Sequence, residues 1–412
     1  METLKVFVMV ECVGQVKRRR VFYIPGYDPI PPRRYRELYR KEGAAQADIS
    51  GYTLSLSPKK GRNFGWSVEA EIDGTKTHSE IDVLVWSDIV QESMEAGIFR
   101  TYLVLLRTAW IYTSTGALFR LMKLRRGPVI AALYPIGVLL LQLLLACLLV
   151  WVVTAVGGLF GLWGHWIGLA LGLVSGAALL RWFKSQDGKV FAYYLMHDYG
   201  FSARWRGANP PVLDTRMAEF RTELAEALRE DWDEVLLIGH SSGAHLGISI
   251  LADLIRAGEV PETGPALSFL TLGQVVPMVS FLPEAKVLRR DLAFLSAREE
   301  VFWLDVTAPG DPCSFALCDP VKVSGVAPND QKWPLVISAA FTQTLSPEKQ
   351  ATLKRRFFRL HFQYLCAFDQ PAEYDYFKIT AGGATLASRY QTHMPSPSRI
   401  DVPANKFKDM AL

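Results

Sequence analysis

One serine in the middle of the chain has the surroundings that nucleophilic chemistry requires. Ser241 is the central residue of the pentapeptide G-H-S-S-G at 239–243, which follows an apolar run at 234–238 and precedes a helix-patterned segment at 244–255. A strand, a G-x-S-x-G turn and a helix are the setting in which a serine is held on a sharp turn with its hydroxyl exposed. Gly239 and Gly243 suit the crowded positions two residues before and after it. The pattern therefore predicts Ser241 as a nucleophile.

The elements that would position this serine alternate between short apolar runs and helical patterns. Such alternation predicts an α/β fold with a mostly parallel sheet covered by helices on both faces. We expect helices at 32–42, 215–230, 244–256 and 347–364. We expect strands at 5–10, 21–24, 52–56, 81–86, 190–196, 235–238, 268–272, 301–306 and 335–340.

A charge-free block interrupts this pattern. No Asp, Glu, Lys or Arg occurs between Gly127 and Leu180. Two spans fit inside the block, at about 129–156 and 159–180, and each reaches the ~20 apolar residues that cross a bilayer. We predict a transmembrane hairpin at 127–183 that turns at Gly157 and Gly158.

The flanks of the hairpin predict its orientation. Basic residues precede the first span and follow the second, but none lies between the spans, so the positive-inside rule places both flanks in the cytoplasm. They are Arg120, Lys123, Arg125, Arg126, Arg181, Lys184 and Lys189. We therefore expect an integral protein of the cytoplasmic membrane, with the lipid bilayer as a partner. Segment 97–126 mixes aromatic with basic residues, which predicts an amphipathic segment in the headgroup region or, alternatively, a helix packed on the soluble domain.

The second span has a glycine every four residues, at Gly164, Gly168, Gly172 and Gly176. Small residues at this spacing let another helix approach closely. We favour packing on the first span of the same chain, and a homodimer through this face is the alternative.

Composition and the absence of several motifs exclude some classes of protein. The 412 residues have a net charge of +4 and five cysteines, an odd number without C-x-x-C spacing, which indicates reduced thiols. We find no phosphate-binding loop, zinc motif or nucleic-acid module, and we expect no cofactor, no metal and no nucleic-acid partner.

Outside the hairpin the chain resembles the α/β-hydrolase superfamily. The resemblance rests on V-F-Y-I-P-G-Y at 21–27, the pentapeptide at 239–243, the segment 301–311 and a late histidine. It implies one α/β-hydrolase domain whose halves, 1–96 and 184–387, are separated by the hairpin. We expect the remaining residues, 388–412, to form a loose polar tail.

The resemblance also implies a catalytic triad in the chain order serine, acid, histidine. Asp311, in the loop after the strand at 301–306, is the predicted acid, and Asp305 within that strand is the alternative. Only two histidines follow the acid. His361, among aromatic residues, is the predicted base, and His393 in the polar tail is the alternative.

The remaining site residues follow from the same comparison. The oxyanion hole would use the backbone N–H groups of Ser242 and Tyr27. Gly26 lets the backbone turn there, although this chain has Pro25-Gly26-Tyr27 where the superfamily has a His-Gly sequence. Gly26, His240 and His197 are candidates for the substrate pocket. The alternative for His240 is packing beside the nucleophile, and for His197 a satisfied histidine at a strand end.

These features predict a membrane-anchored serine hydrolase that cleaves an ester or thioester of an acyl or lipid-like substrate through an acyl-enzyme. An alcohol in place of water would make it an acyltransferase. The alternative is a non-catalytic membrane scaffold or sensor with the same fold. A structure with both late histidines far from Ser241 would favour that alternative.

Overall fold

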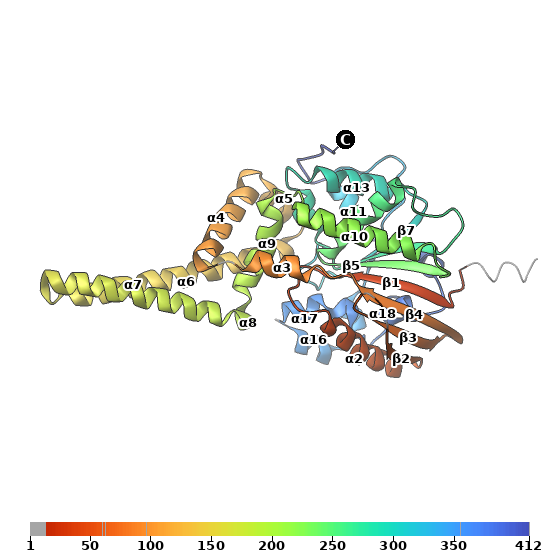
Figure 1. The fold of residues 1–412 in the computed structure, drawn as a ribbon, viewed down its shortest axis with the longest axis horizontal. Coiled ribbons are helices and arrows are strands. Elements are labelled where there is room, and N and C mark those ends of the chain that lie inside the picture. The colour runs from red at the N-terminus through yellow and green to blue at the C-terminus, as the bar shows by residue number, and fades with distance from the viewer. Residues whose placement is uncertain (1–13, 60, 62, 96, 355, 412) are drawn as a thin grey trace, which may run out of the picture. The chain divides into compact units, whose positions relative to one another are not determined.

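The computed structural model describes residues 14–59, 61, 63–95, 97–354 and 356–411 (Figure 1). The predicted strand at 5–10 lies outside these residues. The chain forms two compact units, one made of Met1–Val90 with Gly207–Leu412 and the other of Gln91–Arg206.

The first unit is built on an eight-stranded sheet in the order β2-β3-β4-β1-β5-β6-β7-β8. Strands β4, β1 and β5 to β8 are parallel, and β2, β3 and β4 pair antiparallel at one edge. Every residue of β5 and β7 is buried, as expected for parallel strands covered on both faces. The expected α/β architecture with a mostly parallel sheet is therefore confirmed. The strands are β1 (Arg18–Ile24), β2 (Thr53–Pro58), β3 (Gly65–Ile72), β4 (Thr75–Val83), β5 (Glu234–His240), β6 (Ala266–Leu272), β7 (Val301–Thr307) and β8 (Leu335–Ser338).

Helices cover both faces of this sheet (Figure 1). One face carries α10 (Pro211–Ala227), α11 (Gly243–Arg256) and α13 (Lys286–Ser296). The other carries α2 (Arg33–Ser50), α16 (Pro347–Leu353), α17 (Phe357–His361) and α18 (Tyr376–Ala381). Shorter or peripheral helices are α3 (Ser87–Met94), α12 (Val276–Ser280), α14 (Pro320–Val323), α15 (Phe341–Thr344), η1 (Gln363–Leu365) and α19 (Leu386–Tyr390).

Two expectations for the C-terminal part differ from the structure. The helix expected at 347–364 is broken, because Lys354 leaves the helical region at the end of α16. His361 is therefore the last residue of the short α17. Segment 388–412 is no loose tail, since Ile400 donates a backbone hydrogen bond to Leu317 (2.7 Å) and the buried Asn405 donates to the Ser280 carbonyl (2.8 Å).

The second unit is helical, with α4 (Ile98–Ser114), α5 (Ala117–Leu124), α6 (Arg126–Gly158), α7 (Gly161–Ser185), α8 (Asp187–Val190) and α9 (Ala192–Arg204). α6 and α7 run side by side (Figure 1). Both are long and apolar enough to cross a membrane, and only 17% of each apolar window is buried. A pair of helices in a soluble core would be mostly buried, so this exposure favours membrane helices.

The glycine face of α7 packs on α6 within the chain. A methyl group on Gly168 would lie 2.9 Å from the Val153 carbonyl oxygen, and one on Gly172 would lie 2.9 Å from that of Val150. The favoured prediction for these glycines, packing on the first span of the same chain, therefore agrees with the structure, since α6 occupies this face. The homodimer stays a prediction, and the contact between α6 and α7 does not support it.

The strand expected at 190–196 is wrong, since these residues end α8 and begin α9. Their apolar side chains pack within the helical unit, where Ala192 and Met196 form one cluster with Leu105 and Leu139. The inserted unit therefore extends to residues 91–206, beyond the predicted 97–183.

The predicted interfacial segment forms α4 and α5. α4 packs through Leu105, and Tyr102 donates a hydrogen bond to the Leu139 carbonyl of α6 (3.0 Å). Its other side leaves apolar side chains exposed, among them Phe99 and Trp110. The contacts of α4 are therefore with helices of its own unit, and its exposed apolar side chains are compatible with the predicted amphipathic segment.

Candidate functional site

Ser241 lies on a strained turn between β5 and α11. Its φ is +56°, in the left-handed region that a residue with a side chain rarely adopts. The Ser241 N–H donates to the Leu272 carbonyl at the end of β6 (2.9 Å). The turn thereby anchors Ser241 at the carboxyl ends of the central strands.

The two glycines of the pentapeptide make this turn possible. A methyl group on Gly239 would lie 2.7 Å from both the Ala244 Cα and the Gly243 carbonyl oxygen. One on Gly243 would overlap the carbonyl oxygen of Ile24, the last residue of the neighbouring strand β1. The structure therefore confirms that both glycines occupy crowded positions around the serine, as predicted.

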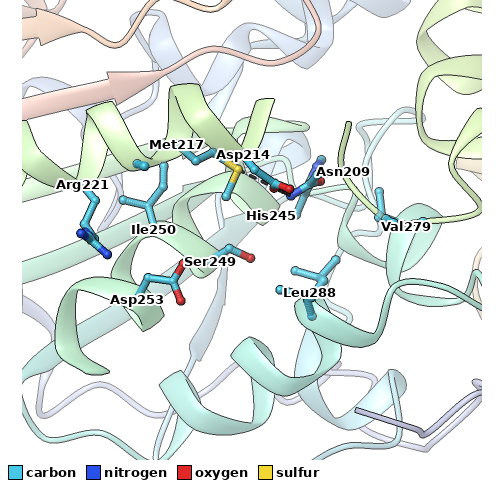
Figure 2. Close-up of a pocket in the computed structure, with 14 residues that line it drawn as sticks. Asn209, Asp214, Met217, Arg221, His245, Ser249, Ile250, Asp253, Val279 and Leu288 are labelled. Carbon is cyan, nitrogen blue, oxygen red and sulfur yellow. Dashed lines mark hydrogen bonds between the residues drawn. The ribbon is translucent and has the colours of Figure 1, made fainter. Parts of the chain in front are cut away.

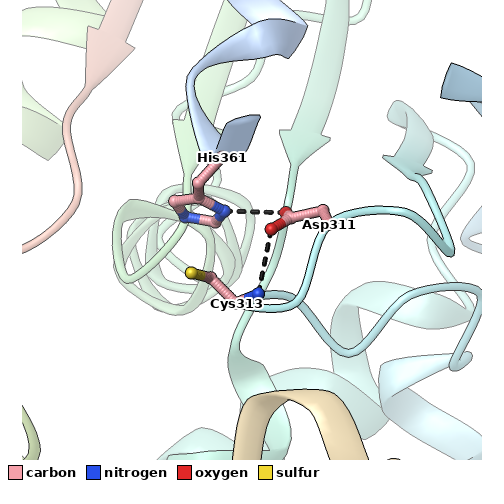
Figure 3. A group of neighbouring side chains, drawn as sticks. All are labelled: Asp311, Cys313 and His361. Carbon is pink, nitrogen blue, oxygen red and sulfur yellow. Dashed lines mark hydrogen bonds and ion pairs between the residues drawn. The ribbon is translucent and has the colours of Figure 1, made fainter. Parts of the chain in front are cut away.

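His361 and Asp311 form a buried pair (Figure 3). The His361 Nδ1–H donates to Asp311 Oδ2 over 2.7 Å. Because Nδ1 carries the proton, Nε2 has the lone pair, and it has no hydrogen-bond partner in the described part of the chain. This is the arrangement that a general base requires, with one nitrogen held and the other available.

Asp311 is kept ionised by its neighbours. Burial alone would raise the pKa of this carboxyl, but its attraction to the His361 ring when that ring is protonated, and hydrogen bonds from His361, the Cys313 N–H and the Tyr364 hydroxyl, hold the pKa below its ordinary value. The alternative acid, Asp305, is in the opposite situation. Burial raises the pKa of Asp305 to about 8, and among the described residues only Thr271 donates a hydrogen bond to it. The geometry thus favours Asp311 over Asp305 as the partner of the histidine, and Asp305 is a buried carboxyl inside β7.

The end of β6 links the serine to the histidine. Leu272 accepts the Ser241 backbone hydrogen bond, and the next residue, Gly273, touches the imidazole. A methyl group on Gly273, whose φ is +55°, would lie 3.0 Å from His361 Cε1 and 2.7 Å from the Tyr364 ring. Glycine at this position therefore lets the base approach the turn that carries Ser241.

His240 is buried beneath the imidazole of His361. Its ring is stacked on that of His361, with centroids 4.9 Å apart, and its Nε2–H donates to the His361 carbonyl (3.1 Å). The Tyr23 hydroxyl then donates to Nδ1 of His240 (3.3 Å). Burial, and next the charge of His361, lower the pKa of His240 to about 3, so the ring is neutral. This position agrees with the alternative for His240, which is packing beside the predicted nucleophile.

The predicted oxyanion loop lies against the serine. A methyl group on Gly26 would be 2.9 Å from the Ser241 Cβ and 3.4 Å from its Oγ. The Trp86 indole N–H donates to the Pro25 carbonyl (3.0 Å) and holds this loop. The backbone N–H of Ser242, at the start of α11, makes no hydrogen bond in the described part of the chain. Ser242 is thus placed to stabilise an oxyanion, and the second donor, Tyr27, stays a prediction.

Two other predicted histidines have different partners. His197 belongs to α9 in the second unit, where its Nε2 bonds the Thr101 hydroxyl (3.1 Å). His393 packs on the Tyr390 ring and lies 3.9 Å from Glu373. Neither is brought to Ser241 by a contact of the described residues.

A pocket of about 280 Å³ lies between α10, α11 and the segment from α12 to α13 (Figure 2). The triad residues do not line it. His245, four residues after Ser241, does line it, and burial lowers the pKa of this imidazole to about 4. His245 is therefore an uncharged residue of this pocket at neutral pH.

Sequence reasoning missed Tyr364, Cys313 and Gly273. Tyr364 shares Oδ2 of Asp311 with the base and accepts the Ala308 N–H (3.0 Å), so it fixes the acid loop. Its spacing of three residues from His361 was the available signal. Cys313 lies two residues after the acid, and its N–H donates to Asp311 Oδ1 (2.9 Å).

No protein-family model matches the chain, and no curated protein and no solved structure is significantly similar to it. The function must therefore be argued from the geometry of the site.

Proposed function

We propose that this protein is a membrane-anchored serine hydrolase of the α/β-hydrolase type, which cleaves an ester or thioester of an acyl or lipid-like substrate. The observation that carries the proposal is the buried His361–Asp311 pair. Nε2 of His361 has no hydrogen-bond partner among the described residues, and the ring lies next to the turn of Ser241.

The chain order of the three residues supports the α/β-hydrolase assignment. Ser241 follows β5, Asp311 follows β7 and His361 follows β8, which is the order nucleophile, acid, histidine of that superfamily. Each residue comes from beyond the carboxyl end of a parallel strand, where sites of open α/β sheets form.

In the proposed reaction, Ser241 Oγ attacks the acyl carbon while His361 Nε2 takes the hydroxyl proton. Asp311 stabilises the imidazolium through Nδ1–H, and the Ser242 N–H, with the Tyr27 N–H as the second donor, stabilises the oxyanion. The imidazolium then protonates the departing alcohol or thiol. Water, deprotonated by His361, attacks the acyl-enzyme and releases the carboxylic acid and free Ser241.

No described residue donates a hydrogen bond to Nε2 of His361. This is compatible with the proposed reaction, since catalytic hydrogen bonds often tighten only when substrate is bound.

A lipid-like substrate is supported by the second unit. Its two apolar helices are of membrane-spanning length, and α4 exposes Phe99 and Trp110 beside basic residues. The basic flanks of α6 and α7 favour a cytoplasmic location for the catalytic unit.

Labelling with a fluorophosphonate probe tests the proposal on the full chain in detergent. Wild type is expected to label, and Ser241→Ala to lose labelling while it unfolds at the same temperature. Ser242→Ala is the matched variant, and it still labels because the oxyanion donor is its backbone N–H. Folded wild-type protein that does not label would rule out the proposed activity.

A further inference from the structure

Cys313 lies against the His361–Asp311 pair (Figure 3). One ligand atom each from Asp311, Cys313 and His361 lie within 4.8 Å of one another. Asp311 and His361 are buried, and Cys313 is half-buried, so the cluster has one side accessible to solvent. The bond from the Cys313 N–H to Asp311 Oδ1 turns the loop so that both side chains face the imidazole.

These distances are close to those of a metal site. Three atoms no more than 4.8 Å apart have a point within about 2.8 Å of each, compared with ~2.0–2.3 Å for zinc bonds to nitrogen, oxygen and sulfur. Side-chain shifts of well under 1 Å would therefore bring all three atoms to bonding distance. His361 has a second reason to accept an ion, because its Nε2 is unpartnered in the described chain and only 6% of the residue is exposed.

The donor set selects the kind of ion. A thiolate, an imidazole and a carboxylate suit Zn²⁺, whereas Mg²⁺ and Ca²⁺ prefer oxygen ligands alone. Three protein ligands leave a fourth position for water or another small ligand. On binding, the Cys313 thiol loses its proton to solvent and the sulfur bonds to the metal.

We propose that Asp311, Cys313 and His361 bind Zn²⁺, and that the bound ion reversibly switches off the triad. A metal on Nδ1 would replace the proton shared with Asp311, and a metal on Nε2 would occupy the lone pair that accepts the Ser241 proton. Either way His361 ceases to be a base. Inhibition rests on the proposed hydrolase function, but binding does not.

Binding is tested with the full chain in detergent, freed of metal, by Zn²⁺ competition against a chromophoric chelator. Wild type is expected to bind one Zn²⁺, and Cys313→Ser to weaken binding at least about tenfold. Cys147→Ser, in the exposed thiol of α6, is the matched control and keeps the affinity. Equal affinity in wild type and Cys313→Ser, with both folded by circular dichroism, would overturn the site. Excess Mg²⁺ is expected not to compete, and competition by Mg²⁺ would contradict the thiolate ligand.

Inhibition is tested separately by the rate of fluorophosphonate labelling. Zn²⁺ is expected to slow labelling of wild type at the concentrations that fill the site, and EDTA to restore it. For Cys313→Ser, the labelling rate is compared with that of the same variant without metal. At least about tenfold more Zn²⁺ than for wild type should be needed to slow it. Undiminished labelling of Zn²⁺-loaded wild type would overturn the switch. Protein that binds Zn²⁺ through Cys313 but never labels would retain the metal site and lose the hydrolase proposal.

Discussion

Nδ1 of His361 lies 2.7 Å from Oδ2 of Asp311, although fifty residues separate them in the chain. Only 8% of the histidine side chain and none of the aspartate side chain is exposed to solvent. In such surroundings the hydrogen bond fixes both the tautomer and the orientation of the imidazole, because water cannot replace the partner. The pair therefore determines which ring nitrogen is available to Ser241.

Asp311→Asn should abolish most of the activity. An amide does not hold the proton on Nδ1 or stabilise the imidazolium, and comparable changes in triads lower kcat by ~10⁴. We expect hydrolysis of a p-nitrophenyl ester to fall by about 10²–10⁴ at neutral pH. Asp305→Asn is the matched control and should retain activity, since Asp305 lies inside β7 and accepts a hydrogen bond from Thr271 of the neighbouring strand β6. The opposite ranking of the two variants would make Asp305 the acid.

Asp305 should also make stability depend on pH. Its pKa is about 8 in the fold because of burial, compared with ~3.9 when unfolded. Between these values the folded state holds a proton that the unfolded state has lost. The stabilisation is thus complete below about pH 4 and is lost as the pH rises through about 8.

Removal of this group should remove the pH dependence. The apparent unfolding temperature of Asp305→Asn, minus that of wild type, should increase from pH 5 to pH 9. Any cost of burying the asparagine amide does not vary over this pH range, so the slope of the difference against pH is the diagnostic quantity. A difference that is constant with pH would show that Asp305 is ionised in the fold.

Gly26→Ala should impair catalysis more than folding. Its methyl group would lie 2.9 Å from the Ser241 Cβ, so the loop with Tyr27 or the serine itself must move. A displacement of about 1 Å near a reacting group can cost ~10²-fold in rate, and we expect a loss of this size in kcat/KM. Gly264→Ala is the control, because its methyl group finds the nearest heavy atom at 3.5 Å. Equal activity of the two variants would remove Gly26 from the site.

Gly172→Leu should disrupt the packing of α6 on α7. A methyl group added at Gly172 would lie 2.9 Å from the Val150 carbonyl oxygen, so a larger side chain must separate the helices. We expect faster proteolysis of the hairpin and a lower unfolding temperature in detergent. Gly137→Leu, on α6, is the matched change, since no heavy atom lies within 4 Å of its added methyl group. If both variants behave alike, the glycine face does not hold the hairpin together.

Much of the fold could be predicted because it depends on local pattern. The parallel strands β5, β6 and β7 are buried apolar runs, and their predicted bounds lie close to the observed ones. β3 was missed, since its buried residues alternate with the exposed Glu69 and Glu71. Residues 190–196 were mistaken for a strand because an apolar run that packs inside a helical unit has the same composition.

The prediction of the site was strongest where the geometry depends on residues that are neighbours in the chain. The left-handed turn of Ser241 and the glycines around it lie within five consecutive residues. Asp311 and His361 were predicted as the acid and the base, but alternatives for both stayed open. A choice between Asp305 and Asp311 needs burial and partners, which depend on segments far away in the chain.

The sequence by itself determined that Ser241 lies on a tight strand-to-helix turn and that two helices are apolar enough to cross a membrane. Both are consequences of short-range sterics and hydropathy, which neighbouring residues dictate. Only the tertiary structure decided that His361 bonds Asp311, that His240 lies buried beneath the base and that Cys313 completes a cluster of metal-binding donors. These contacts join the end of β5, the loop after β7 and the end of α17, and tertiary packing brings these segments together in a way that spacing along the chain does not encode.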